Sequence, residues 1–350
     1  MKKIKPAGLL SALSAAMFML LIITSPEICT SGAAKGLLLA GRVIIPSLFP
    51  FTACVLFLMK SGALKIFRFA GGFTEKVLGI SGEAFSIMLL SFTGGYPVGA
   101  KLLNEAVRDG HISPRNAGIM LNYCVNAGPA FVILAVGSGT VGSKKVGYIL
   151  LAAHILSALI LSLLSAFLIK KEDLPAPASS SGAGAAENFV NSVSEAAASV
   201  FSICAYVVLF STVTAYTDSL SQKIPAFGAA AKLLEVTNAV NGERNIIVIS
   251  FLLGFAGISI WCQVISVGRL IKFGFLLFAA SRILHGLLSA GICALLLRLF
   301  GIAFAVSSKI RFAPSYSGAA LSLSMLCMVI VLLISLFRKK NTGNILEDIV

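Results

Sequence analysis

The chain has 350 residues, of which 57% are hydrophobic and 12% are charged, and its mean hydropathy is +0.96. Soluble proteins average roughly 45–50% apolar and about 25% charged residues, so this composition excludes a disordered chain and argues against a soluble enzyme. The net charge of +14 comes from cations at the edges of apolar runs, for example Lys2, Lys170 and Arg338, which favours anchoring in a membrane over nucleic-acid binding.

Eight apolar segments are long enough for membrane-spanning helices, which need about 20 apolar residues. They cover residues 7–24, 36–59, 119–136, 146–169, 199–216, 246–267, 273–300 and 318–337. A shorter segment, 85–93, ends at Gly94 and is typical of a half-helix or a re-entrant hairpin. We therefore predict an all-α polytopic membrane protein of about eight transmembrane helices with re-entrant or broken helices.

The N-terminal segment also fits a secretory signal peptide, because basic residues precede an apolar stretch. The stretch 9–24 is longer than the usual apolar region of roughly 7–15 residues, which favours a retained first helix. Basic residues near both ends of the chain predict that both termini are cytoplasmic.

A segment rich in Pro, Ser, Gly and Ala, residues 172–187, predicts a flexible linker between two membrane modules. The predicted domains are an N-terminal helix (1–35), the first module (36–171), the linker, the second module (188–337) and a C-terminal tail (338–350).

The two modules share a short sequence match. Residues 89–94, Leu-Leu-Ser-Phe-Thr-Gly, match residues 252–257, Leu-Leu-Gly-Phe-Ala-Gly, in four of six positions. We therefore predict that the modules are structural repeats in which Gly94 corresponds to Gly257. The match does not distinguish inverted repeats from parallel repeats.

The first interruption by small and polar residues is at 94–101, Gly-Gly-Tyr-Pro-Val-Gly-Ala-Lys. Glycine permits backbone conformations closed to other residues, and proline suits the start of a new helix. The free N–H groups of that helix would bind an anion, so we predict solute contacts here. The candidate residues are Gly94, Gly95, Pro97, Gly99 and Lys101. The alternative is a tight loop in which Lys101 pairs with a glutamate one turn later.

Two asparagines precede the second interruption, at Gly128 and Pro129. Asn122 and Asn126 share a helix face because they are spaced i, i+4. Proline ends a helix and frees backbone carbonyls, and broken helices expose such groups to solutes or ions in transporters. We therefore predict a helix break here and place Asn122, Asn126 and Gly128 in the binding site. The alternative is that the amides are hydrogen-bonding contacts between helices.

Two polar stripes lie in the second module. Glu235, Asn238 and Asn241 follow i, i+3 spacing, and a carboxylate at membrane depth would bind a proton, a cation or a polar solute. A solvated interfacial helix is the alternative for this stripe. Ser259 and Gln263 share a face inside an apolar run, which predicts that they point into the helix bundle.

Arg42, Arg282 and His285 also lie within apolar segments. We interpret them as side chains that snorkel to lipid headgroups, with a proton relay through Arg282 and His285 as the alternative. The seven cysteines lack CxxC spacing, the three histidines lack HExxH spacing, and no Walker A or GxSxG motif occurs. We therefore expect no metal, no cofactor and no enzymatic activity.

Residues 94–101 and 122–131 (NYCVNAGPAF), together with 234–238 and 253–263, resemble the nucleoside-recognition (Gate) domain proteins, especially the sporulation integral membrane proteins of that family. The resemblance covers roughly residues 36–337 as two Gate-like modules. It implies a membrane protein of spore-forming bacteria that moves dipicolinate, a small aromatic dianion, across the outer forespore membrane.

The family name also implies an analogy with the concentrative nucleoside transporters, in which a Glu with nearby Thr, Asn and Gln on broken helices binds the solute. The matching residue types in this chain are Glu235, Thr237, Asn238 and Gln263.

We therefore predict a secondary transporter for a small polar, anionic aromatic solute such as dipicolinate, located in a bacterial membrane as a multi-pass protein. The alternatives are a nucleoside transporter and a non-transporting scaffold or sensor of spore-envelope assembly. The expected partners are a small-molecule solute and membrane lipid, without nucleic acid. A second copy of the chain or other sporulation membrane proteins are further candidate partners.

Overall fold

The computed structural model describes residues 6–62, 71–170 and 184–302, and the elements in these ranges are all helices. The all-α prediction is therefore confirmed. The helices before the linker are α1 (Pro6–Thr24), α2 (Pro26–Leu39), η1 (Ala40–Ile44), α3 (Ile45–Lys60), α4 (Gly71–Leu78), α5 (Gly82–Gly94), α6 (Val98–Arg108), α7 (Pro114–Cys124), η3 (Ala130–Thr140) and α8 (Lys144–Ala166). Those after it are α9 (Ala185–Ser221), α10 (Ala226–Leu234), α11 (Val236–Gly242), α12 (Ile246–Phe255), α13 (Gly257–Val267) and α14 (Phe275–Leu299).

Four helical stretches are long and apolar enough to cross a membrane: α8, α9, α14 and the stretch formed by α12 with α13. Two sharply bent pairs, α1 with α2 (105°) and α4 with α5 (80°), raise the number to six if each pair is one span. The described residues thus give fewer spans than the seven predicted within them, because segments 36–59 and 119–136 are interrupted. The predicted span 318–337 lies outside the described residues, as does most of the predicted linker 172–187, although α9 already begins at Ala185.

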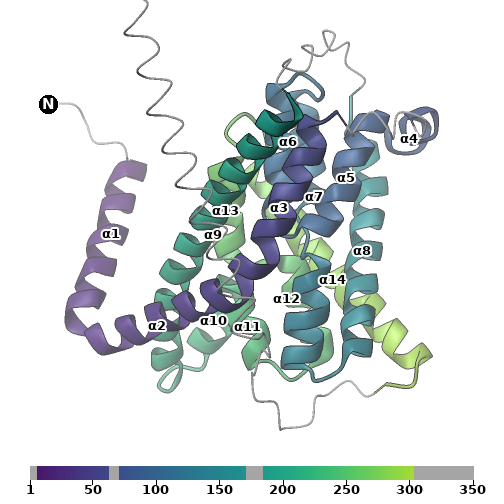
Figure 1. The fold of residues 1–350 in the computed structure, drawn as a ribbon. Helices are drawn as coiled ribbons and strands as arrows, with labels where there is room; N and C mark the ends of the chain where they lie inside the picture. The colour runs from purple at the N-terminus through teal and green to yellow at the C-terminus, as the bar shows by residue number, and fades with distance from the viewer. Residues whose placement is uncertain (1–5, 63–70, 171–183, 303–350) are drawn as a thin grey trace, which may run out of the picture.

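The interruption of segment 36–59 has a local cause. A π-helical turn, η1, separates α2 from α3, and α3 contains Pro46 and Pro50, each of which removes a backbone donor. Before this turn α2 runs across the base of α9, where Gly36 allows the two backbones to meet. A Cβ on Gly36 would lie 2.7 Å from the Cα of Val208 (Figure 1).

Two helical hairpins enter the molecule from opposite ends. In the first hairpin, α5 and α6 pack against each other and are joined by residues 95–97. In the second, α10 and α11 pack against each other and are joined at Glu235. Figure 1 shows α6 at the upper end of the molecule and the α10–α11 hairpin at the lower end. The prediction that residues 85–93 form part of a re-entrant hairpin agrees with this arrangement.

Two broken helices accompany the hairpins. Residues 125–128, which are not helical, separate α7 from η3, so the helix break predicted next to Pro129 is present. The second break lies between α12 and α13, where Ala256 (φ 72°) and Gly257 (φ 78°) adopt left-handed conformations. A left-handed alanine is uncommon, and it ends α12 without ending the stretch as a whole.

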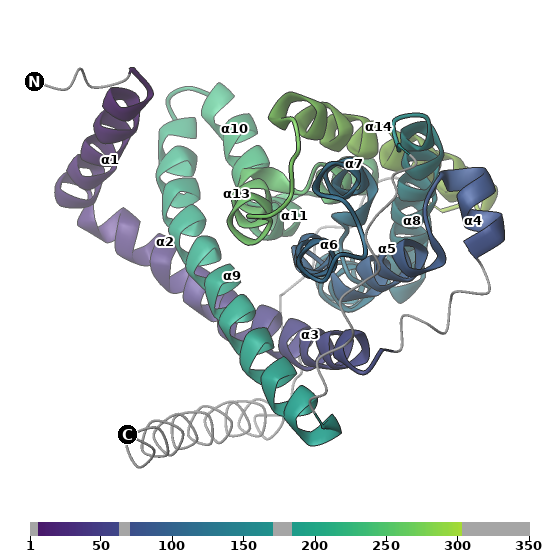
Figure 2. The same cartoon turned by 90° about the horizontal axis from the view of Figure 1, so that it is seen from above.

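The order of elements repeats across the linker. A long helix, a hairpin, a broken helix and a second long helix occur as α3, α5–α6, α7–η3 and α8, and again as α9, α10–α11, α12–α13 and α14. The long helices pair across the repeats, α3 with α9 and α8 with α14, and members of each pair run in opposite directions (Figure 1). The repeats are therefore inverted. Seen from above, the hairpins and broken helices occupy the centre of the molecule (Figure 2).

This order changes the predicted correspondence of glycines. Gly95 at the first hairpin tip lies against Gly128 of the first break, since a Cβ on Gly95 would be 3.2 Å from the Gly128 nitrogen. Gly257 of the second break lies against the second hairpin tip, where a Cβ would be 3.1 Å from the Val236 nitrogen. Gly257 thus takes the place of Gly128, not of Gly94. The predicted correspondence of Gly94 with Gly257 was wrong because the two matching segments only share the end of a helix. Residues 89–94 lead into a hairpin tip, whereas residues 252–257 lead into the second half of a broken helix.

Gly99 allows α6 to lie directly on the end of α7, because a Cβ there would be 1.7 Å from the backbone oxygen of Cys124. We expect Gly99→Ala to lower the melting temperature and the yield of monodisperse protein in detergent, since overpacking costs about 1–3 kcal/mol. The matched control is Gly291→Ala in α14, where nothing lies within 4 Å of the added carbon. Equal melting temperatures for the two variants would contradict this packing.

Candidate functional site

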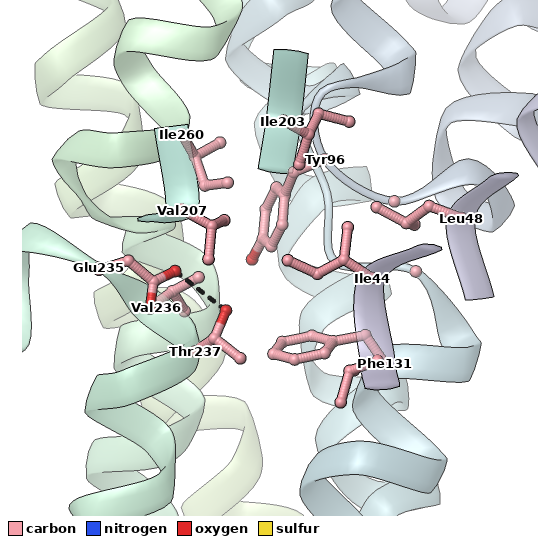
Figure 3. A pocket seen from close by; sticks show the side chains of 13 residues that line it. Ile44, Leu48, Tyr96, Phe131, Ile203, Val207, Glu235, Val236, Thr237 and Ile260 are labelled. Atoms are coloured by element: carbon pink, nitrogen blue, oxygen red, sulfur yellow. Dashed lines mark hydrogen bonds between the residues drawn. The ribbon is translucent and has the colours of Figure 1, made fainter. Parts of the chain in front are cut away.

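A central cavity lies where the two hairpin tips meet the first break. Its free volume is about 40 Å³, and most of its lining is apolar. The lining residues are Val43, Ile44, Leu48, Gly95, Tyr96, Gly128, Phe131, Ile203, Val207, Glu235, Val236, Thr237 and Ile260. Figure 3 shows Glu235 and Thr237 on one wall, opposite Ile44, Tyr96 and Phe131 on the other. The cavity therefore lies between the two inverted repeats.

Glu235 supplies the ionisable group of this cavity and is fully buried. Its Oε2 accepts a hydrogen bond from the backbone N–H of Asn238 (2.7 Å), and its Oε1 accepts one from the hydroxyl of Thr237 (2.9 Å). The Asn238 amide in turn donates to the hydroxyl of Ser211 in α9 (2.9 Å). Burial of Glu235 excludes the alternative of a solvated interfacial helix for this residue, whereas Asn241 of the same stripe is exposed.

The aromatic wall links the two repeats. Tyr96 is buried at the first hairpin tip, and its hydroxyl donates a hydrogen bond to the carbonyl of Leu253. That carbonyl belongs to the last turn of α12, where the second break interrupts the helical hydrogen bonds. A side chain of the first repeat therefore satisfies the backbone of the second.

The first break is satisfied by the second repeat in the same way. Arg282 of α14 donates from Nη1 to the carbonyl of Val125 (2.6 Å) and from Nη2 to the carbonyl of Asn122. Arg282 is 0% exposed, so the interpretation that it snorkels to lipid headgroups is wrong. Its side chain points into the bundle because backbone carbonyls there need a donor. Arg42, by contrast, is exposed, as the snorkelling interpretation expects.

Two stacked histidines lie beside the first break, and one of them binds its backbone. The backbone N–H of Ala127 donates to Nε2 of His154 in α8 (2.9 Å), and Nε2 of His285 donates to the carbonyl of His154 (3.1 Å). The two rings stack with centroids 4.5 Å apart, and both residues are fully buried. Snorkelling is therefore wrong for His285 as well, because its ring is held inside the α8–α14 contact.

The predicted site residues divide into three groups. Four of them line the cavity: Gly95, Gly128, Glu235 and Thr237. Six are buried around it without lining it: Gly94, Pro97, Gly99, Asn122, Asn126 and Gln263. The others serve neighbouring contacts: Asn238 binds α9, Ser259 accepts from the Gln263 amide (3.3 Å), and Lys101 faces α9.

Lys101 does not provide charge to the cavity. Its Nζ donates to the carbonyl of Glu195 (3.1 Å) and to the hydroxyl of Ser199 (2.5 Å), so it attaches the first hairpin to α9. The alternative pairing with Glu105 is also not formed, since Glu105 pairs with Arg108.

Asn126 bonds within its own break, where its Nδ2 donates to the carbonyl of Tyr123 (2.7 Å). The side-chain oxygens of Asn122, Asn126 and Gln263 are buried and have no hydrogen-bond partner among the described residues. Asn122 and Asn126 lie at the first break, whereas Gln263 lies within α13, beyond the second break.

Tyr96, Phe131 and His154 contribute to the cavity or to the break beside it, and none of them was predicted from the sequence. Tyr96 lies between the predicted Gly95 and Pro97, so its position in the break was a usable signal. Phe131 and His154 lie in apolar helices and carry no distinguishing pattern. Within the described residues, no group of three or more His, Cys, Asp or Glu side chains could hold a metal ion.

One curated protein shows similarity to most of the chain. It is the "Sporulation integral membrane protein YlbJ" of Bacillus subtilis (strain 168), which is 24% identical over 320 residues, covering 77% of this chain and 78% of that protein. No family model and no solved structure matches the chain. The chain is thus a multi-pass membrane protein related to a sporulation integral membrane protein.

The hydroxyl of Tyr96 is expected to stabilise the contact between the repeats. In Tyr96→Phe the buried Leu253 carbonyl loses its donor, which costs about 1–3 kcal/mol, so we expect a melting temperature several degrees below that of the wild type. The measurement is thermal unfolding in detergent. Tyr148→Phe is the control, because Tyr148 is 60% exposed. A Tyr96→Phe protein as stable as this control would contradict the assigned bond.

Proposed function

We propose that the protein is a secondary transporter for a small, flat aromatic solute, which it moves by alternating access of its two repeats. The observation that carries the proposal is the convergence of two inverted hairpins and a broken helix on one cavity that holds a buried carboxylate. Discontinuous helices that meet between inverted repeats are the usual place for a transporter's binding site.

The size of the cavity indicates a closed conformation. Its free volume of about 40 Å³ is far below the roughly 300–1,000 Å³ of pockets that hold small-molecule ligands. An aromatic solute therefore requires the Tyr96 tip and the Glu235 tip to move apart. Because these tips belong to opposite repeats, a rotation of one repeat against the other would open the cavity.

The lining fits a ring with polar substituents. Tyr96 and Phe131 offer aromatic surfaces, while Glu235 and Thr237 face them with polar groups. Dipicolinate is our first candidate, because the related curated protein is named for sporulation. A carboxylate solute beside Glu235 requires a shared proton, since two carboxylates in one site cannot both ionise. Transport of dipicolinate would then carry a proton on Glu235.

A nucleoside is the second candidate, and the position of Glu235 favours it. An ionised Glu235 would accept hydrogen bonds from the hydroxyl groups of a sugar, with the base against the aromatic wall. This is also the arrangement that the resemblance to the Gate domain proteins implies. The outer forespore membrane is the location we propose for the dipicolinate function, and a bacterial cell membrane for either function.

A scaffold or sensor of spore-envelope assembly is the non-transporting alternative. The positions of Asn126 and Gln263 favour this alternative, because both side chains are buried and neither lines the cavity. Glu235 favours transport, because its donors, the Thr237 hydroxyl and backbone N–H groups at the start of α11, are all uncharged. A fully buried carboxylate with no cation beside it among the described residues is costly as a purely structural element.

The test is uptake of labelled dipicolinate and labelled nucleosides into vesicles that contain the purified protein. We expect Glu235→Gln to lower uptake about tenfold or more per folded protein, since ~1.4 kcal/mol is a decade of affinity. For dipicolinate, the residual uptake should also lose its response to an imposed pH gradient, because a glutamine side chain cannot bind and release a proton.

The control for this experiment is Glu75→Gln, which changes an exposed carboxylate in α4. Normal uptake by Glu235→Gln would remove Glu235 from the site. Absence of uptake of either solute by the folded wild-type protein would favour the scaffold alternative.

A further inference from the structure

Arg282 is a buried cation without a carboxylate partner. It lies about two turns into α14 with an exposed fraction of 0%, and none of the ion pairs formed by the described residues includes it. A guanidinium buried away from water needs a compensating negative potential. The neighbours of Arg282 must therefore supply that potential.

The C-terminal end of α7 supplies it. The two carbonyls that accept from Arg282, those of Asn122 and Val125, lie at the break where α7 has no further turn to satisfy them. The C-terminal end of a helix carries the negative end of its dipole, which favours a cation. The guanidinium thus occupies a place that the broken backbone makes favourable for a positive charge.

The other contacts around Arg282 are uncharged at their contacting groups. The ring centroid of Phe278 lies 5.6 Å from the guanidinium carbon, and the stacked His154 and His285 rings lie nearby in the α8–α14 contact. The Tyr96 hydroxyl, which keeps its proton to donate to Leu253, and the buried thiol of Cys124 also lie close to the guanidinium. These groups hold α8, α14 and the break together, but they contribute no carboxylate. The carbonyls of α7 therefore remain the counter-charge of Arg282 among the described residues.

In transporters with broken helices, unwound carbonyls and the C-terminal ends of half-helices bind the coupling Na⁺ or proton. We infer that Arg282 is a built-in cation, whose guanidinium permanently occupies the position that a coupling cation would take at the break of α7. A metal cation at the same carbonyls would be repelled by this fixed charge. The break therefore requires neither Na⁺ nor K⁺. If the proposed transport function holds, transport needs no sodium gradient at this break.

The first test uses the purified full-length wild-type protein in a non-ionic detergent. Its thermal unfolding is measured in sodium, potassium or choline chloride at one ionic strength. We expect the same melting temperature in all three salts, because the break already holds its cation. A melting temperature raised specifically by sodium or potassium would overturn the inference.

The second test removes the guanidinium and offers cations from solution. We expect Arg282→Ala to melt about 5 °C or more below the wild type, and to be stabilised by low millimolar guanidinium chloride and by sodium chloride. Urea is the neutral match for guanidinium and should not stabilise the variant. An equal response to urea and guanidinium, or no response to either cation, would overturn the inference, because the charge would then not matter.

Arg298→Ala is the matched control, since Arg298 is an exposed arginine of the same helix. It should keep the wild-type melting temperature and respond to none of these additives. Arg282→Lys covers the case in which Arg282→Ala does not fold. The lysine keeps the charge, so this variant should fold and melt independently of the salt used, and its failure to fold would overturn the inference.

All of these measurements read stability, so failure of this inference and failure of the transport proposal are separate results.

Discussion

The structure depends on one constraint, namely that backbone groups freed by a helix break inside an apolar bundle must find hydrogen-bond partners. Each of the two breaks in the described residues finds partners in its own repeat, such as His154 for Ala127 and Trp261 for Phe255, and also a partner in the opposite repeat. Tyr96 of the first repeat donates to Leu253 at the second break, and Arg282 of the second repeat donates to Asn122 and Val125 at the first break. This reciprocal exchange joins the two repeats, in addition to the packing of α3 on α9 and of α8 on α14.

The same exchange ties the cavity to the relative position of the repeats. Tyr96 both lines the cavity and bonds to α12, so a rotation that opens the cavity also removes the donor from Leu253. The buried oxygens of Asn122, Asn126 and Gln263 lack partners among the described residues, and in the proposed transport function the same rotation would change their surroundings.

The positions of the helix breaks were easier to predict from the sequence than the contacts that the residues at those breaks make. Glycine and proline act locally on the backbone, so the breaks after Gly94 and before Pro129 follow from residue type alone. The buried Glu235 was also identified, because a carboxylate in a modestly apolar segment is conspicuous. The direction of Lys101 and the correspondence of Gly257 could not be predicted, because both depend on which helices pack together. Similar apolar sequences can end a hairpin helix or a half-helix, so the match between residues 89–94 and 252–257 does not identify equivalent positions.

The residues that share a helix face with Arg282 could have shown that it does not face lipid. Snorkelling assumes that an arginine lies on a lipid-facing stripe, but Arg282 shares its face of α14 with His285, Gly286 and Ser289, all of which are buried. A face of small and polar residues is typical of helix–helix contacts in membranes, where close approach replaces the hydrophobic effect. Gly286 permits such an approach, since a Cβ on it would lie 2.9 Å from the backbone oxygen of Phe251 in α12. An arginine on that face cannot reach a lipid headgroup, so its partner has to be sought among the freed carbonyls of a neighbouring broken helix.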